Sequence, residues 1–165
     1  MKDKTGLGGI FSIECYDRNG RLKWKDRSHN LVVNAGLDHL LGVVFHGVTP
    51  VSPWYIGLIA DGPTIDPTDT LSSHAGWTED TKYTGNRKEF VEGVAAGQSI
   101  SNSGNAGAFA INDTTTLAGA FICSAETGTS GTLFCAAAFT QGDRAVLSGD
   151  QVNVTYTLSA ADDGA

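Results

Sequence analysis

Acid, hydroxyl and imidazole side chains gather in one short stretch of this sequence. Asp69, Ser72, Ser73 and His74 are the residue types of a catalytic triad, in which a histidine activates a serine and an aspartate orients the histidine. A working triad is assembled from separate parts of a fold, because a few consecutive loop residues cannot align the three groups. These polar residue types are common in loops, which explains the cluster better. A small hydrolase is therefore the weakest of the candidate functions.

Three carboxylates in the same region, Asp61, Asp66 and Asp69, are oxygen ligands of the kind that calcium prefers. They lack both the aspartate spacing and the closing glutamate of a calcium loop. Aspartates beside glycine and proline are common turn formers, which is the simpler explanation. The four histidines are not spaced as zinc ligands, and Gly6–Gly9 precedes a strand, whereas a phosphate loop follows one. We therefore expect no catalytic residues, no metal and no cofactor.

The composition favours a single β-rich domain. The chain has 165 residues, 21 glycines, few charges and a formal net charge of −7, which together suit short strands joined by tight turns. An acidic chain is repelled by nucleic acid and by anionic membranes, so neither is an expected partner. The cysteines, Cys15, Cys123 and Cys135, lie in apolar strand patterns and predict free buried thiols in a reducing cytoplasm.

The charge is unevenly distributed along the chain. Residues 1–27 carry seven basic and four acidic side chains, a net +3, which leaves −10 for the other 138 residues. This asymmetry predicts a basic contact surface at Arg18, Arg21, Lys23 and Lys25. The alternative is a solvated hairpin with scattered basic residues.

The clearest single element is a strand near the C-terminus, from Asp150 to Ala160. Its apolar residues alternate with polar ones, which predicts a half-buried strand of fixed register. The inward side chains are Val152, Val154, Tyr156 and Leu158. Residues 161–165 are expected to form a polar tail.

A hairpin is predicted from Gly8 to Lys25. Asn19-Gly20 is a strong turn signal that needs positive φ at both positions. Pairing outward from it places Glu14 opposite Lys25 and Cys15 opposite Trp24. Residues 1–7 show no pattern and are expected to be a flexible arm unless a partner orders them.

One helix is predicted over residues 35–46, with Asn34 as its N-cap and Gly47 as its stop. Its apolar residues recur at helical spacing and should pack over the sheets, plugging the sandwich. They are Leu37, Leu40, Leu41, Val44 and Phe45.

A central strand at Trp54–Ile59 is followed by a long segment without periodicity, 61–86. Loops of this length are often functional, so we interpret it as a contact loop, with Trp77 and Arg87 as candidate contact residues. Short strands with intervening turns follow. They are 88–94, 98–102, 108–112, 117–124 and 132–139, the last two forming a hairpin. The fold class is therefore all-β, a jelly-roll-like two-sheet β-sandwich over residues 8–160 with one short helix.

Four segments resemble a family of small structural proteins of tailed bacteriophages, the head decoration (cement) proteins. The segments are 30–37, 54–58, 74–79 and 149–158. The resemblance covers most of the chain from residue 30 onward and implies a β-sandwich virion component. It implies no enzymatic activity and leaves open whether the protein lies on the head or the tail.

The resemblance and the charge pattern together predict a decoration protein that binds the major capsid protein shell and self-associates on its lattice. It would be made in the host cytoplasm and lie on the outer capsid surface. The alternative is a tail-tip or fibre module that binds host glycans through exposed aromatic side chains. The candidates for that role are Trp54, Tyr55, Trp77 and Tyr83.

Overall fold

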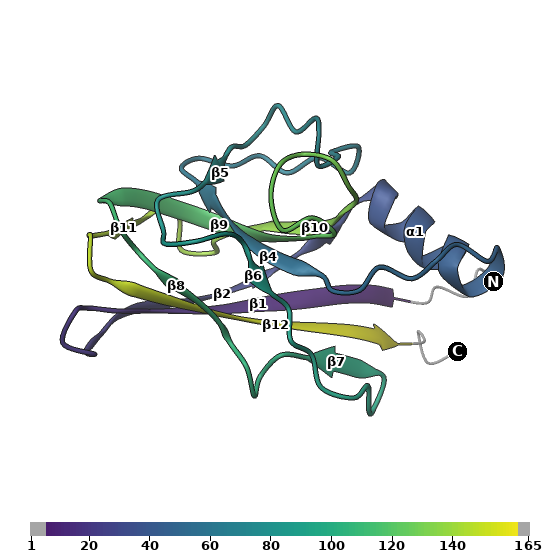
Figure 1. Cartoon of the computed structure of the whole chain (residues 1–165), viewed down its shortest axis with the longest axis horizontal. Coiled ribbons are helices and arrows are strands. Elements are labelled where there is room, and N and C mark those ends of the chain that lie inside the picture. Colours follow the sequence, from purple (N-terminus) through teal and green to yellow (C-terminus); the bar gives the residue numbers. More distant parts are fainter. Residues whose placement is uncertain (1–5, 162–165) are drawn as a thin grey trace.

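In the computed structural model, which describes residues 6–161, two antiparallel sheets stack face to face (Figure 1). Of the described residues 46% are in strands and 8% in the helix, so the expected all-β two-sheet sandwich with one helix is confirmed. Helix α1 (Asn34–Phe45) lies at the end of the sandwich where β1 begins and β12 ends (Figure 1). No helix of the described residues is long and apolar enough to cross a membrane.

Sheet A is built around the predicted C-terminal strand. Its order is β2–β1–β12–β7, and β8 also pairs with β12. The bounds are β1 Gly6–Tyr16, β2 Leu22–His29, β7 Ser99–Ser101, β8 Gly107–Ala110 and β12 Gln151–Ala161. Val152, Val154 and Tyr156 are buried and Leu158 is half-buried, as their alternation predicted. Residues 6, 7 and 161, expected in a flexible arm and a tail, instead belong to β1 and β12, whereas 1–5 and 162–165 lie outside the described residues.

Sheet B has the order β3–β10–β9–β4–β5, with β11 also on β9 and β6 also on β4. The bounds are β3 Leu31–Val32, β4 Tyr55–Ala60, β5 Glu79–Asp80, β6 Lys88–Glu89, β9 Thr115–Cys123, β10 Leu133–Ala138 and β11 Arg144–Val146. The β9–β10 hairpin and the central place of β4 are confirmed. The strand predicted at 88–94 is limited to the two residues of β6.

The hairpin register is confirmed, but its turn differs from the prediction. Glu14 pairs with Lys25 and Cys15 with Trp24. Within the turn Gly20 has positive φ (76°), while Asn19 does not, so the prediction for Asn19 was wrong. The carboxylate of Asp17 accepts the amide hydrogens of Asn19 (2.8 Å) and Arg21 (3.0 Å), which stabilises this turn.

The helix is where the sequence predicts it, but its surroundings are not as expected. Val33 is the N-cap, without a side-chain capping bond, so Asn34 as N-cap was wrong. Of the helix residues only Gly36 is buried, and a Cβ there would lie 2.3 Å from the carbonyl oxygen of Phe134 on β10. The helix therefore rests on β10 through a glycine, and its apolar stripe is not the plug that periodicity predicted.

Two hydrophobic clusters hold the molecule together. The larger lies between the sheets and includes Phe11, Phe109 and Tyr156. The smaller includes Ile59, Trp77 and Phe121, and joins the long loop to β4 and β9. Segment 61–78 thus covers sheet B, because Leu71 and Trp77 from this loop are themselves buried.

Candidate functional site

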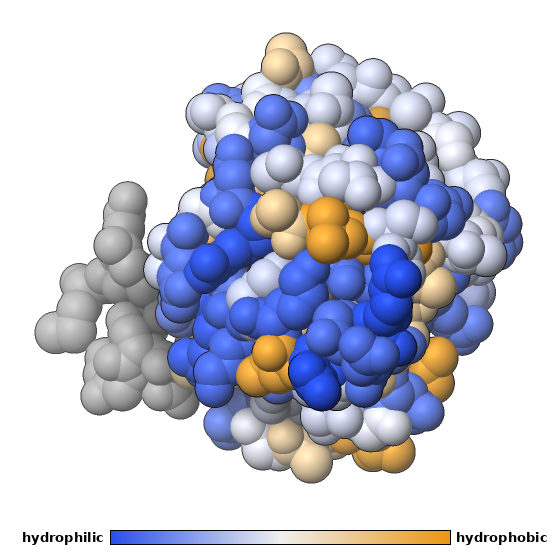
Figure 2. All heavy atoms as spheres, turned by 90° about the vertical axis from the view of Figure 1, so that its left-hand side faces the viewer, coloured by the Kyte–Doolittle hydropathy of each residue, from blue (hydrophilic) through white to orange (hydrophobic). Residues whose placement is uncertain are grey.

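The predicted basic hairpin forms a continuous exposed face on the molecule. Along β2 the exposed residues alternate with Trp24, Asp26 and Ser28, which are buried or half-buried. We call the exposed set the basic face: Lys23, Lys25, Arg27 and His29. Arg18 and Arg21 are exposed in the adjacent turn. Figure 2 views the molecule from the β11 side and shows a mostly hydrophilic surface with separate hydrophobic spots.

The four predicted contact residues are not equally available to a partner. Lys23 forms an ion pair with the buried carboxylate of Asp150, which also accepts the amide hydrogen of Leu147 (2.8 Å). Lys25 lies opposite Glu14, whose carboxylate accepts the Tyr16 hydroxyl (2.6 Å), and this bond raises the pKa of Tyr16. Within residues 6–161 the ion pairs are Lys23–Asp150 and Arg87–Glu79, so Arg18, Arg21 and Lys25 have none there.

Arg27 and His29 complete the basic face, although charge counting did not single them out. Both continue the every-second-residue spacing of Lys23 and Lys25 along β2. That spacing is visible in the sequence and places all four side chains on one side of a strand. Strand alternation was thus the signal that could have found them.

Arg87 was predicted to contact a partner, but the structure buries it, leaving it 6% exposed. Its guanidinium binds both carboxylate oxygens of Glu79, at 2.7 and 2.6 Å. It also donates to the carbonyl oxygens of Ala125 and Gly128, each at 2.8 Å. Arg87 therefore fastens the β9–β10 loop to β5 and presents no free guanidinium to a partner.

Trp77 is likewise a core residue, 4% exposed. Its indole nitrogen donates to Asp69 (2.9 Å), and the His74 ring stacks on it at a centroid distance of 3.8 Å. A His74 ring nitrogen lies 2.9 Å from the carbonyl oxygen of Trp77. Asp69 and His74 thus each bind Trp77 rather than each other, and the cluster with triad residue types orders the long loop.

Two of the three carboxylates considered as cation ligands, Asp66 and Asp69, bind neighbouring donors instead. Asp66 accepts the hydroxyl (2.6 Å) and amide (2.8 Å) of Thr68, bonds that lower its pKa, and Asp69 accepts the amide of Asp66 (3.0 Å). No group of three or more metal-binding side chains comes together in the described part of the chain.

The four aromatic residues considered for glycan stacking do not share an exposed surface. Trp77 and Tyr83 are buried. Trp54 is half-buried against the core between the sheets, whereas Tyr55 packs against the smaller cluster. A sugar-binding platform needs exposed aromatic faces on one side, which these side chains do not provide.

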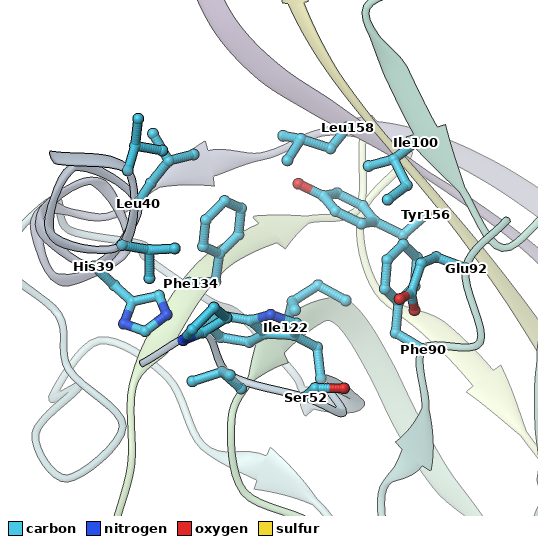
Figure 3. Close-up of a pocket in the computed structure, with 15 residues that line it drawn as sticks. His39, Leu40, Ser52, Phe90, Glu92, Ile100, Ile122, Phe134, Tyr156 and Leu158 are labelled. Atoms are coloured by element: carbon cyan, nitrogen blue, oxygen red, sulfur yellow. The ribbon is translucent and has the colours of Figure 1, made fainter. Parts of the chain in front are cut away.

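An apolar cavity of about 350 Å³ opens at the α1 end of the sandwich. Figure 3 shows His39 and Leu40 on the helix at one side and Ile100, Tyr156 and Leu158 of sheet A at the other. Sheet B supplies Ile122 and Phe134. The Pro50–Trp54 segment, together with Phe90 and Glu92, completes the wall. The sequence does not reveal this cavity, because its lining comes from seven separate segments.

Comparison with protein-family models and with curated proteins gives no match to this chain. The resemblance to phage structural proteins therefore remains an expectation from the sequence.

Proposed function

We propose that this chain is a non-enzymatic bacteriophage structural protein, a capsid decoration protein that binds the major capsid protein shell through its basic face. The observation that carries the proposal is a row of exposed basic side chains on one strand of an otherwise acidic protein. The sequence resemblance supplies the phage context.

Charge complementarity is the physical basis of this attachment. A basic strip steers the protein onto an acidic partner and fixes its orientation, while the acidic remainder is repelled from that partner. A capsid shell presents many equivalent sites, so each individual contact can be modest. The rigid core and the ordered long loop suit a protein that binds as a preformed body.

The first test is the protein composition of purified virions from the source. A copy number that matches the capsid lattice supports decoration. A few copies per particle would contradict decoration and place the protein in the tail, where glycan binding would be tested next. Absence from virions would refute both functions.

The second test measures how much the basic face contributes to binding of purified capsid shells. The double variant Lys25→Glu, Arg27→Glu reverses two exposed charges, and Lys82→Glu makes the same change on an exposed lysine outside this face. We expect shell affinity to fall about tenfold, ~1.4 kcal/mol, in the double variant and to change little in the control. Equal losses in both would show that general charge, not the basic face, governs binding.

A further inference from the structure

The segment from α1 to Pro53 is unusually apolar for a protein surface. Residues 34–53 include one formally charged side chain, Asp38, whereas charged types make up 18% of the chain. Ten large hydrophobic side chains are exposed in the part of the chain that the structure describes, and five of them lie on this segment. We call these five the α1 patch: Leu37, Leu41, Val44, Phe45 and Val48.

Phe45 stands out within the patch. It is the last residue of α1 and is 81% exposed. Phenylalanine is enriched at protein interfaces, and charged residues are depleted from interface cores. A cluster of exposed apolar side chains on one element marks an interaction surface, unlike single exposed residues scattered over a protein.

The apolar cavity lies directly beside this patch. Val44 belongs to both, and His39, Leu40 and Val43 of the same helix also line the cavity (Figure 3). Because an apolar cavity of about 150 Å³ is enough to bind benzene, a cavity of about 350 Å³ has room for a phenyl ring. One surface therefore carries both an exposed aromatic ring and an apolar cavity that fits such a ring.

We infer that a second copy of this chain docks on the α1 patch, with Phe45 of each copy inserted into the cavity of the other. A twofold interface brings the same patch of two subunits together, so it must be self-complementary. A projecting ring next to a matching cavity meets that requirement. A small apolar ligand would fill the cavity but would leave Phe45 and Leu41 in water. This inference is independent of the proposed function, since it concerns the protein alone in solution.

Sedimentation velocity of the purified chain tests the inference, over about 1–500 µM to include the weak dimers that small interfaces form. We expect a concentration-dependent dimer whose Kd rises at least about tenfold in Phe45→Ser. The matched control is Leu147→Ser, which removes an exposed leucine from the turn before β12, at the end of the sandwich opposite α1 (Figure 1). A monomer at every concentration, or a dimer that Phe45→Ser leaves intact, would overturn the inference.

Cysteine cross-linking tests the geometry without relying on a loss of binding. Phe45→Cys in one preparation and Val51→Cys in another place one thiol on the projecting position and one in the cavity wall. On mixing with an added thiol oxidant, we expect the mixed disulfide-linked dimer to form faster than the dimer from Phe45→Cys and Leu147→Cys. Equal rates would overturn the proposed docking, as would native mass spectra showing a small apolar molecule bound to a stable monomer.

Discussion

At the scale of single residues, a series of side-chain hydrogen bonds links the two sheets through the core. The buried Tyr156 hydroxyl of β12 receives a hydrogen bond from Asn30 (2.9 Å) and one from the thiol of Cys135 on β10 (3.4 Å). Asn30 in turn accepts the amide hydrogen of Gly9 on β1 (2.6 Å). Burial raises the pKa of Tyr156, so its phenol stays neutral.

Gly9, whose amide donates to Asn30, has no room for a side chain. A Cβ at Gly9 would lie 2.4 Å from the Tyr156 hydroxyl oxygen, whereas one at Gly8 would have no atom within 4 Å. We expect Gly9→Ala to lower the free energy of unfolding by about 1–3 kcal/mol because the Tyr156 ring must shift in a packed core. Urea unfolding measures this, with Gly8→Ala as the control. Equal effects of the two substitutions would contradict the steric explanation.

The cysteines give a prediction that depends on pH. Burial above all raises the pKa of Cys15 and of Cys135 to about 12, from an ordinary 9.0, and also raises that of Cys123. We expect all three thiols to resist alkylation in the native protein and to react once denaturant exposes them, as counted by mass spectrometry.

The sign of the accompanying stability change follows from the same pKa values. Because the folded pKa of Cys15 and Cys135 exceeds the unfolded value, their neutral thiols favour the folded state fully below pH 9. That stability is lost as the pH rises from 9 toward 12. Rapid native alkylation of Cys135 near pH 8 would contradict its burial.

At the scale of elements, the sequence predicts best where the signals are local. The register of β1 and β2 follows from one turn and the alternation on either side of it. The helix could be located from its period, but the period does not reveal what covers the apolar face. Packing at Gly36 depends on close contact with Phe134, a residue 98 positions away. The strands β3, β5 and β11 have two or three residues, too few to show a period.

The long loop and the β9–β10 loop depend on one buried guanidinium. Arg87→Lys keeps the charge but loses the bidentate bond to Glu79 and at least one bond to the carbonyls of Ala125 and Gly128. We expect a loss of about 2 kcal/mol in the free energy of unfolding, because the buried acceptors lose their donors. We also expect faster proteolysis within residues 124–131.

Arg27→Lys is the matched control for this substitution, since Arg27 is exposed on β2. It should leave both the urea midpoint and the proteolysis rate close to those of the unaltered protein. If Arg87→Lys behaves in the same way, the guanidinium is not what holds the two loops.

At the scale of the whole molecule, residue type alone did not distinguish inside from outside. Arg18, Arg21, Lys23 and Lys25 were predicted to be at the surface, and the structure exposes them. Arg87 carries the same charge but lies in the core, because Glu79 and two carbonyl groups from distant segments replace water around it. Trp77 was predicted to contact a partner, but it is buried within its own domain.

The two proposed associations have different physical origins, so salt should change them in opposite directions. Attachment through the basic face depends on attraction between unlike charges, which salt screens. Docking through the α1 patch is apolar, and two copies that each carry a net charge of −7 repel one another until salt screens that repulsion.

Raising sodium chloride from about 0.05 M to about 0.5 M shortens the Debye length from about 14 Å to about 4 Å. We therefore expect the dimer Kd from sedimentation to fall while binding to capsid shells, followed by co-sedimentation, weakens. Phe45→Ser should weaken the dimer at both salt concentrations and leave the salt response of shell binding unchanged. The Lys25→Glu, Arg27→Glu variant should weaken shell binding and reduce its dependence on salt, while its dimer should still tighten as salt rises. A dimer that weakens with salt in parallel with shell binding would mean that ionic contacts hold it together, contrary to docking through Phe45.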